Sequence, residues 1–554
     1  MSSDFPKAVE AFQRGDLGLA LDIAIRTTAV GDPQWQHLIG LIHCRQGDLL
    51  RGLPHLQLAA ETDPANLPFK VMYARALVDA GRPDDVLAMA RPRATHPTAA
   101  DLALWHARAE AAAAAADTTE AADAWKVISD CEPRSAEARS NLAKCMMALE
   151  RFSGAQAVLE AGLQHSPFDI STIMTLGLIY ERTNQLDRLA RLIDEAVERG
   201  ISTDKLSFLR ALREQRAGNL ATAREHLLRS NCADDPVRWY RLRAKIADRE
   251  GDVETAFDAT VALNQSTPDF DAWRQRAAIY RQQLRDLAAT MTTDWARQLV
   301  TCDTIERAPV FLVGFPRSGT TLLDTFLMGH PSIRVIEERE ILRRAGEICG
   351  AQAQLPLANH GTLERARRAY LDELGRRAGS ANPAKIIDKN PFNMVLPGFI
   401  HTLFPSAQII FAKRHPCDAV LSGFMQSFTP NLGMASFMDI ADAADLYDAM
   451  MDVWTNAANV LDLNTHAVTY EKLVEKPEDQ LRPVIEFLGL KWDDRLLDHR
   501  ATAKSRGAIP NTSYDQVTEK LNPQPIGRWR RYEKQLQPVL AVLQPWAERL
   551  GYII

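Results

Sequence analysis

A repeat of about 34 residues runs through the N-terminal half of the chain and limits that half to few folds. Residues 1–290 are rich in Ala, Leu and Arg, and they lack the apolar alternation typical of strands. A small or polar turn residue recurs at steps of 32 to 35 residues. These residues are Gly15, Gly47, Gly81, Ala116, Glu150, Asn184, Gly218 and Gly251. Such a period predicts a stack of short helical units.

Each repeat also has the parts that two packed helices need. A small residue, which lets the second helix approach the first, follows most turns by five residues: Ala20, Gly52, Ala121, Ala155, Ala223 and Ala256. A proline about twelve residues later closes most units and starts the next helix: Pro33, Pro64, Pro97, Pro133, Pro167, Pro236 and Pro268. The pattern resembles that of tetratricopeptide repeats. It predicts an α-solenoid of about eight repeats over residues 1–300.

The resemblance implies that the array binds a protein or peptide partner, although a spacer or an internal brace would need the same repeats. The net charge of −6 gives no reason to expect nucleic acid as a partner. Seven scattered cysteines without CxxC spacing favour a reducing compartment and no metal. The sequence shows no signal peptide and no membrane span, so a cytoplasmic protein is expected. The oligomeric state stays open, with a homodimer as one possibility.

The stretch from Pro309 to Met328 predicts an anion-binding loop. The apolar run Val310–Val313 indicates a buried strand, and a helix is expected to start at Thr320. The loop between them runs from Gly314 to Gly319. Unpaired N–H groups and the macrodipole favour an anion at such a helix start.

This loop has the glycine spacing of a Walker A motif but not its lysine, because Thr320 stands where the lysine belongs. The form Pro-Arg-Ser-Gly-Thr-Thr resembles the loop of sulfotransferases that use the donor PAPS (3′-phosphoadenosine 5′-phosphosulfate). It is most similar to the loop of the tyrosylprotein sulfotransferases and their bacterial relatives. The resemblance implies that the donor's 5′-phosphosulfate is held by Arg317, Ser318, Gly319, Thr320 and Thr321.

Two later segments resemble parts of the same family's catalytic site. Glu338 follows a short apolar run at the distance where the family has its catalytic base, with Glu337 as the next candidate. Lys389 lies in Asp388-Lys389-Asn390-Pro391, which resembles a segment whose lysine lies at the transferred group. The resemblance implies that Lys389 and Arg317 stabilise the leaving oxygen. The acids near residue 338 could instead pair with neighbouring arginines on a solvated helix start.

The nucleotide half of the donor has its own candidate residues. Arg414 lies two residues after the apolar run 407–412, at the end of the expected strand. Ser422 follows eight residues later, as in the family's clamp for the 3′-phosphate. Ser513 and Arg528 match positions in a later loop and a basic segment of the family. The resemblance implies that these two segments close over the donor's phosphates. A structural role is favoured for His415 over that of a general base.

These patterns predict a second domain, residues 301–554, with an α/β fold, a parallel sheet and a phosphate-binding loop. The expected activity is PAPS-dependent sulfuryl transfer to an acceptor hydroxyl, without a metal. If the repeats recruit a polypeptide, that acceptor is expected to be a tyrosine. Two alternatives remain: a repeat scaffold with a degenerate second domain, and a P-loop nucleotide kinase, which would need a lysine and a magnesium-binding Asp.

Overall fold

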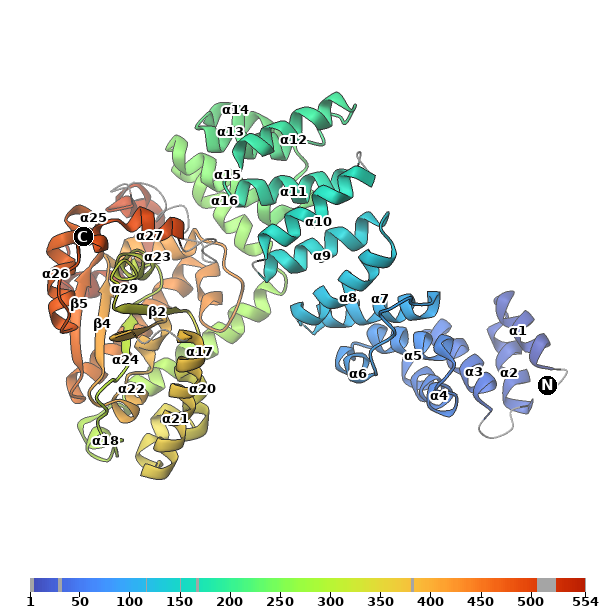
Figure 1. Ribbon diagram of the computed structural model, residues 1–554, viewed down its shortest axis with the longest axis horizontal. Helices are drawn as coiled ribbons and strands as arrows, with labels where there is room; N and C mark the ends of the chain where they lie inside the picture. Colours follow the sequence, from blue (N-terminus) through green and yellow to red (C-terminus); the bar gives the residue numbers. More distant parts are fainter. Residues whose placement is uncertain are drawn as a thin grey trace. The chain divides into compact units, whose positions relative to one another are not determined.

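The structure is a computed structural model of the 554-residue chain, whose element labels are given in Figure 1. It describes residues 4–27, 32–115, 117–149, 151–165, 169–379, 383–505 and 525–553. The chain divides into two compact units, Met1–Asn219 and Leu220–Ile554. The described part of the first unit is helical, whereas the second unit combines helices with a five-stranded sheet.

The first unit is built from short consecutive helices. They are α1 (Phe5–Gln13), α2 (Leu17–Thr27), α3 (Pro33–Arg45), α4 (Leu49–Thr62), α5 (Leu67–Asp79), α6 (Pro83–Ala88), α7 (Ala99–Ala114), α8 (Thr118–Cys131), α9 (Ala136–Ala148), α10 (Phe152–His165), α11 (Ile170–Arg182), α12 (Leu186–Glu198) and α13 (Ser207–Ala217). With α14 (Leu220–Arg229), α15 (Pro236–Glu250) and α16 (Val253–Gln265) of the second unit, the described helices make eight successive pairs in sequence order. The predicted α-solenoid is confirmed.

The turn between α3 and α4 shows how the repeat residues work. Gly47 has a φ of 81°, a conformation that glycine adopts without a steric cost. Asp48 caps α4 by accepting a hydrogen bond from the N–H of Arg51 at 3.0 Å. A Cβ on Gly52 would lie 2.7 Å from Sγ of Cys44, so the small residue is needed for the two helices to touch. Gly47 and Gly52 therefore have the turn and packing roles that the sequence predicts for them.

The second unit continues from α14–α16 into the α/β fold. Its strands are β1 (Val310–Val313), β2 (Ile333–Glu337), β3 (Lys385–Lys389), β4 (Gln408–Lys413) and β5 (Asn464–Thr469). Its further α-helices are α17 (Phe270–Thr290), α18 (Thr293–Arg297), α19 (Thr320–Leu327), α20 (Ile341–Cys349), α21 (His360–Ala378), α22 (Pro397–Leu403), α23 (Pro416–Phe424), α24 (Ile440–Val460), α25 (Tyr470–Glu475), α26 (Pro477–Phe487), α27 (His499–Ser505) and α29 (Glu533–Arg549). Short 3-10 helices are η1 (Cys232–Asp234), η2 (Gln352–Leu357), η3 (Pro391–Val395), η4 (Met434–Met438), η5 (Asp494–Leu497) and η6 (Arg528–Tyr532).

The sheet is parallel throughout, in the order β2-β3-β1-β4-β5. Successive residues of β1 point to opposite faces and join different cores. Phe311 and Val313 belong to one hydrophobic cluster, and Val310 and Leu312 to the other. Because helices cover both faces, the central strand is apolar along its whole length. The predicted α/β domain with a parallel sheet is confirmed.

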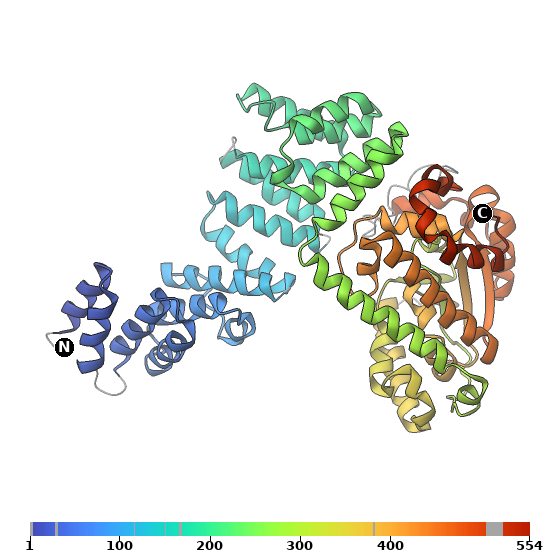
Figure 2. The ribbon, with the colours of Figure 1, turned by 180° about the vertical axis from the view of Figure 1, so that it is seen from behind.

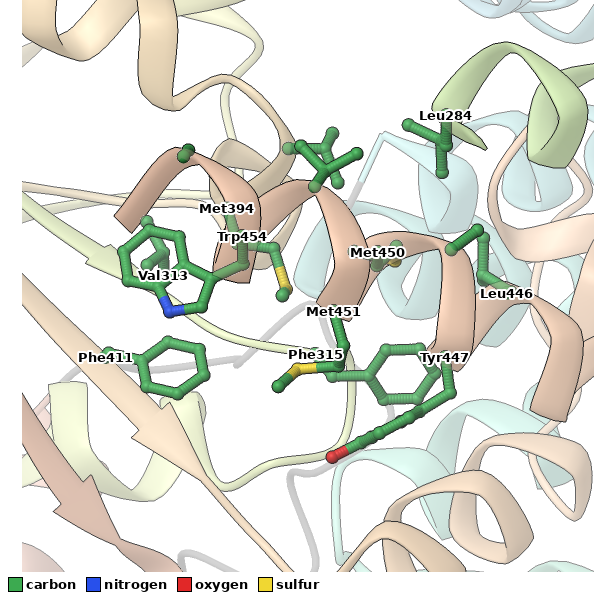
Figure 3. Packing of buried hydrophobic residues seen from close by; sticks show 14 of the residues in the cluster. Leu284, Val313, Phe315, Met394, Phe411, Leu446, Tyr447, Met450, Met451 and Trp454 are labelled. Carbon is green, nitrogen blue, oxygen red and sulfur yellow. The ribbon is translucent and has the colours of Figure 1, made fainter. Parts of the chain in front are cut away.

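Helix α24 covers one face of the sheet with large side chains (Figure 3). The ring of Trp454 stacks on that of Phe411 in β4, with centroids 4.9 Å apart. Tyr447 lies against Phe315, the second residue of the loop after β1, at 4.7 Å. These contacts hold the loop on the face of the sheet that α24 covers.

The long helix α17, green in Figure 2, packs against α24 within the second unit. Arg281 is buried there and pairs with Asp442 at 2.8 Å and with Asp445 at 2.7 Å. Helices α14–α18 thus belong to the same compact unit as the sheet. A functional boundary near residue 300 stays a prediction.

None of the helices in the described ranges is both long enough and apolar enough for a membrane crossing.

Candidate active site

The loop after β1 and the start of α19 lie at the carboxyl end of the central strand. The chain order changes direction at this strand, and ligands of open parallel sheets bind at such points. Gly319 has a φ of 87°, and a Cβ there would lie 2.3 Å from Cδ2 of Tyr470. A Cβ on Gly314 would lie 2.4 Å from the carbonyl oxygen of Ala412. Both glycines are therefore required by close packing, and α19 begins at Thr320 as predicted.

Arg317, inside the loop, connects the loop to the predicted clamp. Its Nε donates a hydrogen bond to Oγ of Ser422 in α23 at 3.2 Å. Its carbonyl oxygen accepts from Nη1 of Arg414 at 2.9 Å. Desolvation by burial, together with the nearby Arg414 cation, lowers the pKa of Arg317 to about 10. Arg317 therefore remains a cation at neutral pH, beside a second cation.

Arg414, which follows β4, has a buried guanidinium held on three sides. It lies over the ring of Tyr470, 4.6 Å from the centroid. Nη2 donates to the carbonyl oxygen of Pro525 at 2.8 Å. Nε is buried and has no hydrogen-bond partner among the described residues. A buried cation with one unused donor suits a phosphate oxygen.

A second charged cluster is centred on Lys389, the last residue of β3. Its side chain is fully buried between two carboxylates, with Nζ 2.5 Å from Oε1 of Glu338 and 3.3 Å from Oδ2 of Asp324. Asp324 is fully buried as well, whereas the side chain of Glu338 is 46% exposed. Burial by itself would lower the pKa of Lys389, but the two carboxylates outweigh burial and raise this pKa.

Glu338 lies just after β2 in an unusual backbone conformation. Its φ is 46°, in the left-handed region that bulky residues rarely adopt. Its N–H donates to the carbonyl oxygen of Lys389 at 2.7 Å, which holds this turn beside the end of β3. Nearby Arg343 pairs with Glu340 and Glu347. Strained residues of this kind cluster at functional sites, where the surrounding contacts compensate for the strain.

Two further predicted residues, Ser513 and Arg528, have different outcomes. Ser513 lies outside the described residues. Arg528 begins η6, and its guanidinium contacts Asp248 of α15 and the sulfur of Met425. The carboxylate of Asp418 in α23 accepts from the N–H groups of Gly527 and Trp529, at 2.7 and 2.8 Å. This double contact fixes the backbone on either side of Arg528.

Three acidic residues of this region were not singled out in the sequence: Asp248, Asp324 and Asp418. Asp324 left a weak signal, because it is the one charged residue in the helical run Thr320–Leu327. Asp418 has the sequence position of an ordinary first-turn acid. His415, for which a structural role was favoured, stacks on Trp529 with centroids 5.1 Å apart.

The described residues contain no group of three or more His, Cys, Asp or Glu side chains placed to hold a metal ion. The candidate site brings together the cations Arg317, Arg414 and Lys389, the hydroxyl of Ser422, the N–H groups at the start of α19 and the carboxylate of Glu338. Such a set can bind a dianion and take a proton from a hydroxyl group.

Residues 309–494 match the model of the Sulfotransferase family. An "Uncharacterized protein" of Aquifex aeolicus (strain VF5) is 27% identical over 55% of this chain and 41% of its own length. Protein-tyrosine sulfotransferase 1 of Danio rerio is 27% identical over 44% of this chain and 72% of its own length. Protein-tyrosine sulfotransferase 1 of Homo sapiens is 26% identical over 44% of this chain and 69% of its own length.

Among solved structures, the sulfotransferase domain of the Synechococcus PCC 7002 olefin synthase aligns with 46% of this chain and 98% of its own. The identity is 21% and the TM-score is 0.33. The family match and the parallel sheet agree on the class of protein: the C-terminal half contains a sulfotransferase domain. Its sequence relatives include protein-tyrosine sulfotransferases, and it follows a solenoid of helical repeats. The chain spans about two fifths of the Aquifex relative.

Proposed function

We propose that this chain transfers the sulfuryl group of PAPS to an acceptor hydroxyl. The observation that carries the proposal is the contact set of Arg317, Ser422 and Arg414 beside the start of α19. Two cations and a hydroxyl group meet there, and Nε of Arg414 still has a hydrogen bond to give. These groups match the two phosphate-bearing ends of the donor in charge and in hydrogen-bond type.

The division of the donor between the two ends follows from their chemistry. Arg317, Ser318, Gly319, Thr320 and Thr321 hold the 5′-phosphosulfate, because the N–H groups at the start of α19 favour an anion. Arg414 and Ser422 hold the 3′-phosphate. Ser513 and Arg528 close over the donor's phosphates from the C-terminal segment.

In the reaction, the acceptor hydroxyl attacks sulfur while Glu338 takes its proton. The bond between sulfur and the bridging oxygen breaks, and that oxygen leaves as part of the 5′-phosphate. Lys389 and Arg317 stabilise the charge on the leaving oxygen. The products are the sulfated acceptor and adenosine 3′,5′-bisphosphate. No step requires a metal.

The cluster around Lys389 supports these roles. Its ammonium has two carboxylates, so it keeps a counter-ion in Asp324 when Glu338 turns to the acceptor. Glu338 is the exposed member of the cluster and can reach an acceptor from solvent. Glu337, the preceding residue, is the next candidate for the base.

For the acceptor, we propose a tyrosine of a polypeptide that the repeats recruit. The support is the name of relatives such as the Danio rerio enzyme, together with the helical array in the same chain. A repeat scaffold with a degenerate second domain is the main alternative, and a P-loop kinase is a further one. A kinase would lose turnover when magnesium is chelated, and a sulfotransferase would not.

The donor site is tested by calorimetric titration with adenosine 3′,5′-bisphosphate on the wild type and on Arg414→Ala. Loss of a charge-assisted phosphate contact costs about 1.5–3 kcal/mol, or roughly tenfold to hundredfold in affinity. The matched control is Lys413→Ala, which removes a cation from the neighbouring residue and leaves affinity unchanged. Thermal unfolding checks that Arg414→Ala is folded. Absence of binding to the wild type would return the chain to the scaffold alternative.

A further inference from the structure

Asp248, near the end of α15, is the meeting point of three side chains from the C-terminal segment. Its carboxylate pairs with Arg528, with Oδ1 3.3 Å from Nε and Oδ2 3.0 Å from Nη2. Nη2 of Arg531 donates to Oδ1 at 2.8 Å, and the hydroxyl of Tyr532 donates to the same oxygen at 2.7 Å. Asp248 and Arg528 are mostly buried, with side chains 20% and 23% exposed. Contacts screened from water in this way are stronger than those of an exposed ion pair.

Two oxygens of one carboxylate facing two nitrogens of one guanidinium make a fork, which fixes the plane of the arginine. The fork uses Nε and Nη2 of Arg528. Asp418 holds the backbone of the same residue from the other side, through the N–H groups of Gly527 and Trp529. Met425, which follows α23, contacts Nη2 at 3.0 Å. Arg528 is thus held through both its backbone and its side chain.

Helix α16 contacts the end of α23, the helix that carries Ser422 of the predicted clamp. The amide of Asn264 in α16 is buried and donates to the carbonyl oxygens of Phe424 and Phe437, at 3.3 and 3.4 Å. Phe424 is the last residue of α23, two positions after Ser422. The ring of Phe257 in α16 also lies 5.0 Å from that of Phe424. Helices α15 and α16 therefore border the part of the second unit that carries Ser422 and Arg528.

We propose that Asp248 is a positioning residue of the donor site, which acts through Arg528. The inference rests on the proposed function, because it takes Arg528 as a donor contact. Asp248 holds the arginine in the geometry that binds phosphate, so less side-chain freedom is lost when the donor binds. A helix of the repeat type thereby becomes a functional part of the sulfotransferase domain and not a spacer in front of it.

The test is a calorimetric cycle with adenosine 3′,5′-bisphosphate on the wild type, Asp248→Asn, Arg528→Ala and the double variant. Asp248→Asn is expected to weaken binding about fivefold to tenfold, and Arg528→Ala about tenfold to hundredfold. Because Asp248 acts through Arg528, the double variant should bind like Arg528→Ala alone. A residue that only supports folding would instead weaken binding equally in both backgrounds.

The matched control is Glu254→Gln. Glu254 of α16 pairs with Lys534 of α29 at 2.8 Å, but both side chains are exposed and lie outside the proposed site. Its affinity should equal that of the wild type. Asp248→Glu keeps the charge, and its affinity should lie between those of the wild type and of Asp248→Asn. This variant tests the inference if Asp248→Asn does not fold.

The outcomes separate this inference from the proposed function. Unchanged or tighter binding by Asp248→Asn, or by Asp248→Glu if only that variant folds, would overturn the positioning role. Additive losses in the double variant would overturn it as well. If the wild type itself fails to bind the bisphosphate, the proposed function fails first.

Discussion

Lys389 shows how a charged residue can be buried completely when two carboxylates pair with it. An ammonium removed from water is costly unless paired, and its pKa would then fall. Asp324, in α19, supplies a negative charge inside the protein, and Glu338 supplies one at the surface. The arrangement keeps Lys389 charged while one of its partners remains accessible. In the proposed reaction, Asp324 stays the counter-ion of Lys389 while Glu338 acts as the base.

Asp388, the residue before Lys389, gives a prediction about stability and pH. Burial raises the pKa of Asp388 to about 7, although the hydroxyl of Tyr370 donates to its Oδ2 at 2.8 Å. The native state therefore holds a proton that the unfolded chain loses near its ordinary pKa of 3.8. The stabilising contribution of this group is complete below that value. It is lost as the pH rises through about 7.

Asp388→Asn should remove this dependence. Urea unfolding of the wild type and of the variant at several pH values between 4 and 8 is the measurement. The free energy of unfolding of the variant, relative to the wild type, should rise across that range. A difference that does not change with pH would show that Asp388 is not protonated in the folded protein.

Among single residues, those that belong to sequence motifs could be predicted, and those whose role depends on partners far away in the chain could not. Arg317, Arg414 and Ser422 were predicted together, and the structure brings them into contact. Asp418 contacts Gly527, 109 residues further along the chain, and Asp248 contacts Arg528, 280 residues further along. Nothing local to an aspartate indicates such a partner. The roles of the predicted residues stay predictions.

At the scale of elements, the loop between β1 and α19 depends on one close approach. Gly319 has a positive φ, and its missing Cβ leaves room for the ring of Tyr470. Tyr470 in turn lies under Arg414. Gly319→Ala should therefore displace Tyr470 and the clamp arginine together. We expect donor-product affinity to fall by about tenfold or more, since that is the effect of losing one charge-assisted contact.

The control for this variant is Gly489→Ala. Gly489 also has a positive φ, of 69°, but a Cβ there would meet no atom within 4 Å. Both variants bear the backbone cost of about 1–2 kcal/mol, which thermal unfolding measures. Only Gly319→Ala should weaken binding of adenosine 3′,5′-bisphosphate in calorimetry. Equal binding by the two variants would mean that the ring contact does not shape the site.

Most elements around the site could be predicted from local sequence patterns. Val310–Val313 forms β1 as predicted, and α23 begins at Pro416. Proline suits this first helical position because an N–H group there would have no partner within the helix. The sheet order, β2-β3-β1-β4-β5, could not be predicted from these patterns, because apolar runs do not say which strands pair. Nor could the sequence show that α17 packs on α24 through a buried arginine, since Arg281 is one of several arginines in a polar helix.

At the scale of the whole molecule, helical repeats and a sulfotransferase domain share one chain. The period of residues 1–290 predicted the first, and the order of short motifs predicted the second. The compact units divide at Asn219, well before the change in sequence pattern near residue 300. Helices of the repeat type thus lie in the unit of the sheet, where Asp248 contacts Arg528 and Asn264 contacts Phe424 at the end of α23.

Sulfuryl transfer is tested most directly by measuring the transfer of ³⁵S from labelled PAPS by the full chain. Acceptors are a tyrosine-containing peptide, the same peptide with phenylalanine, and a polysaccharide. The wild type should label the tyrosine peptide only. Glu338→Gln should lower the rate about 10²–10⁴-fold, the usual effect of losing a general base, while donor-product binding is unchanged. No transfer to any of these acceptors, or full activity of Glu338→Gln, would contradict this account.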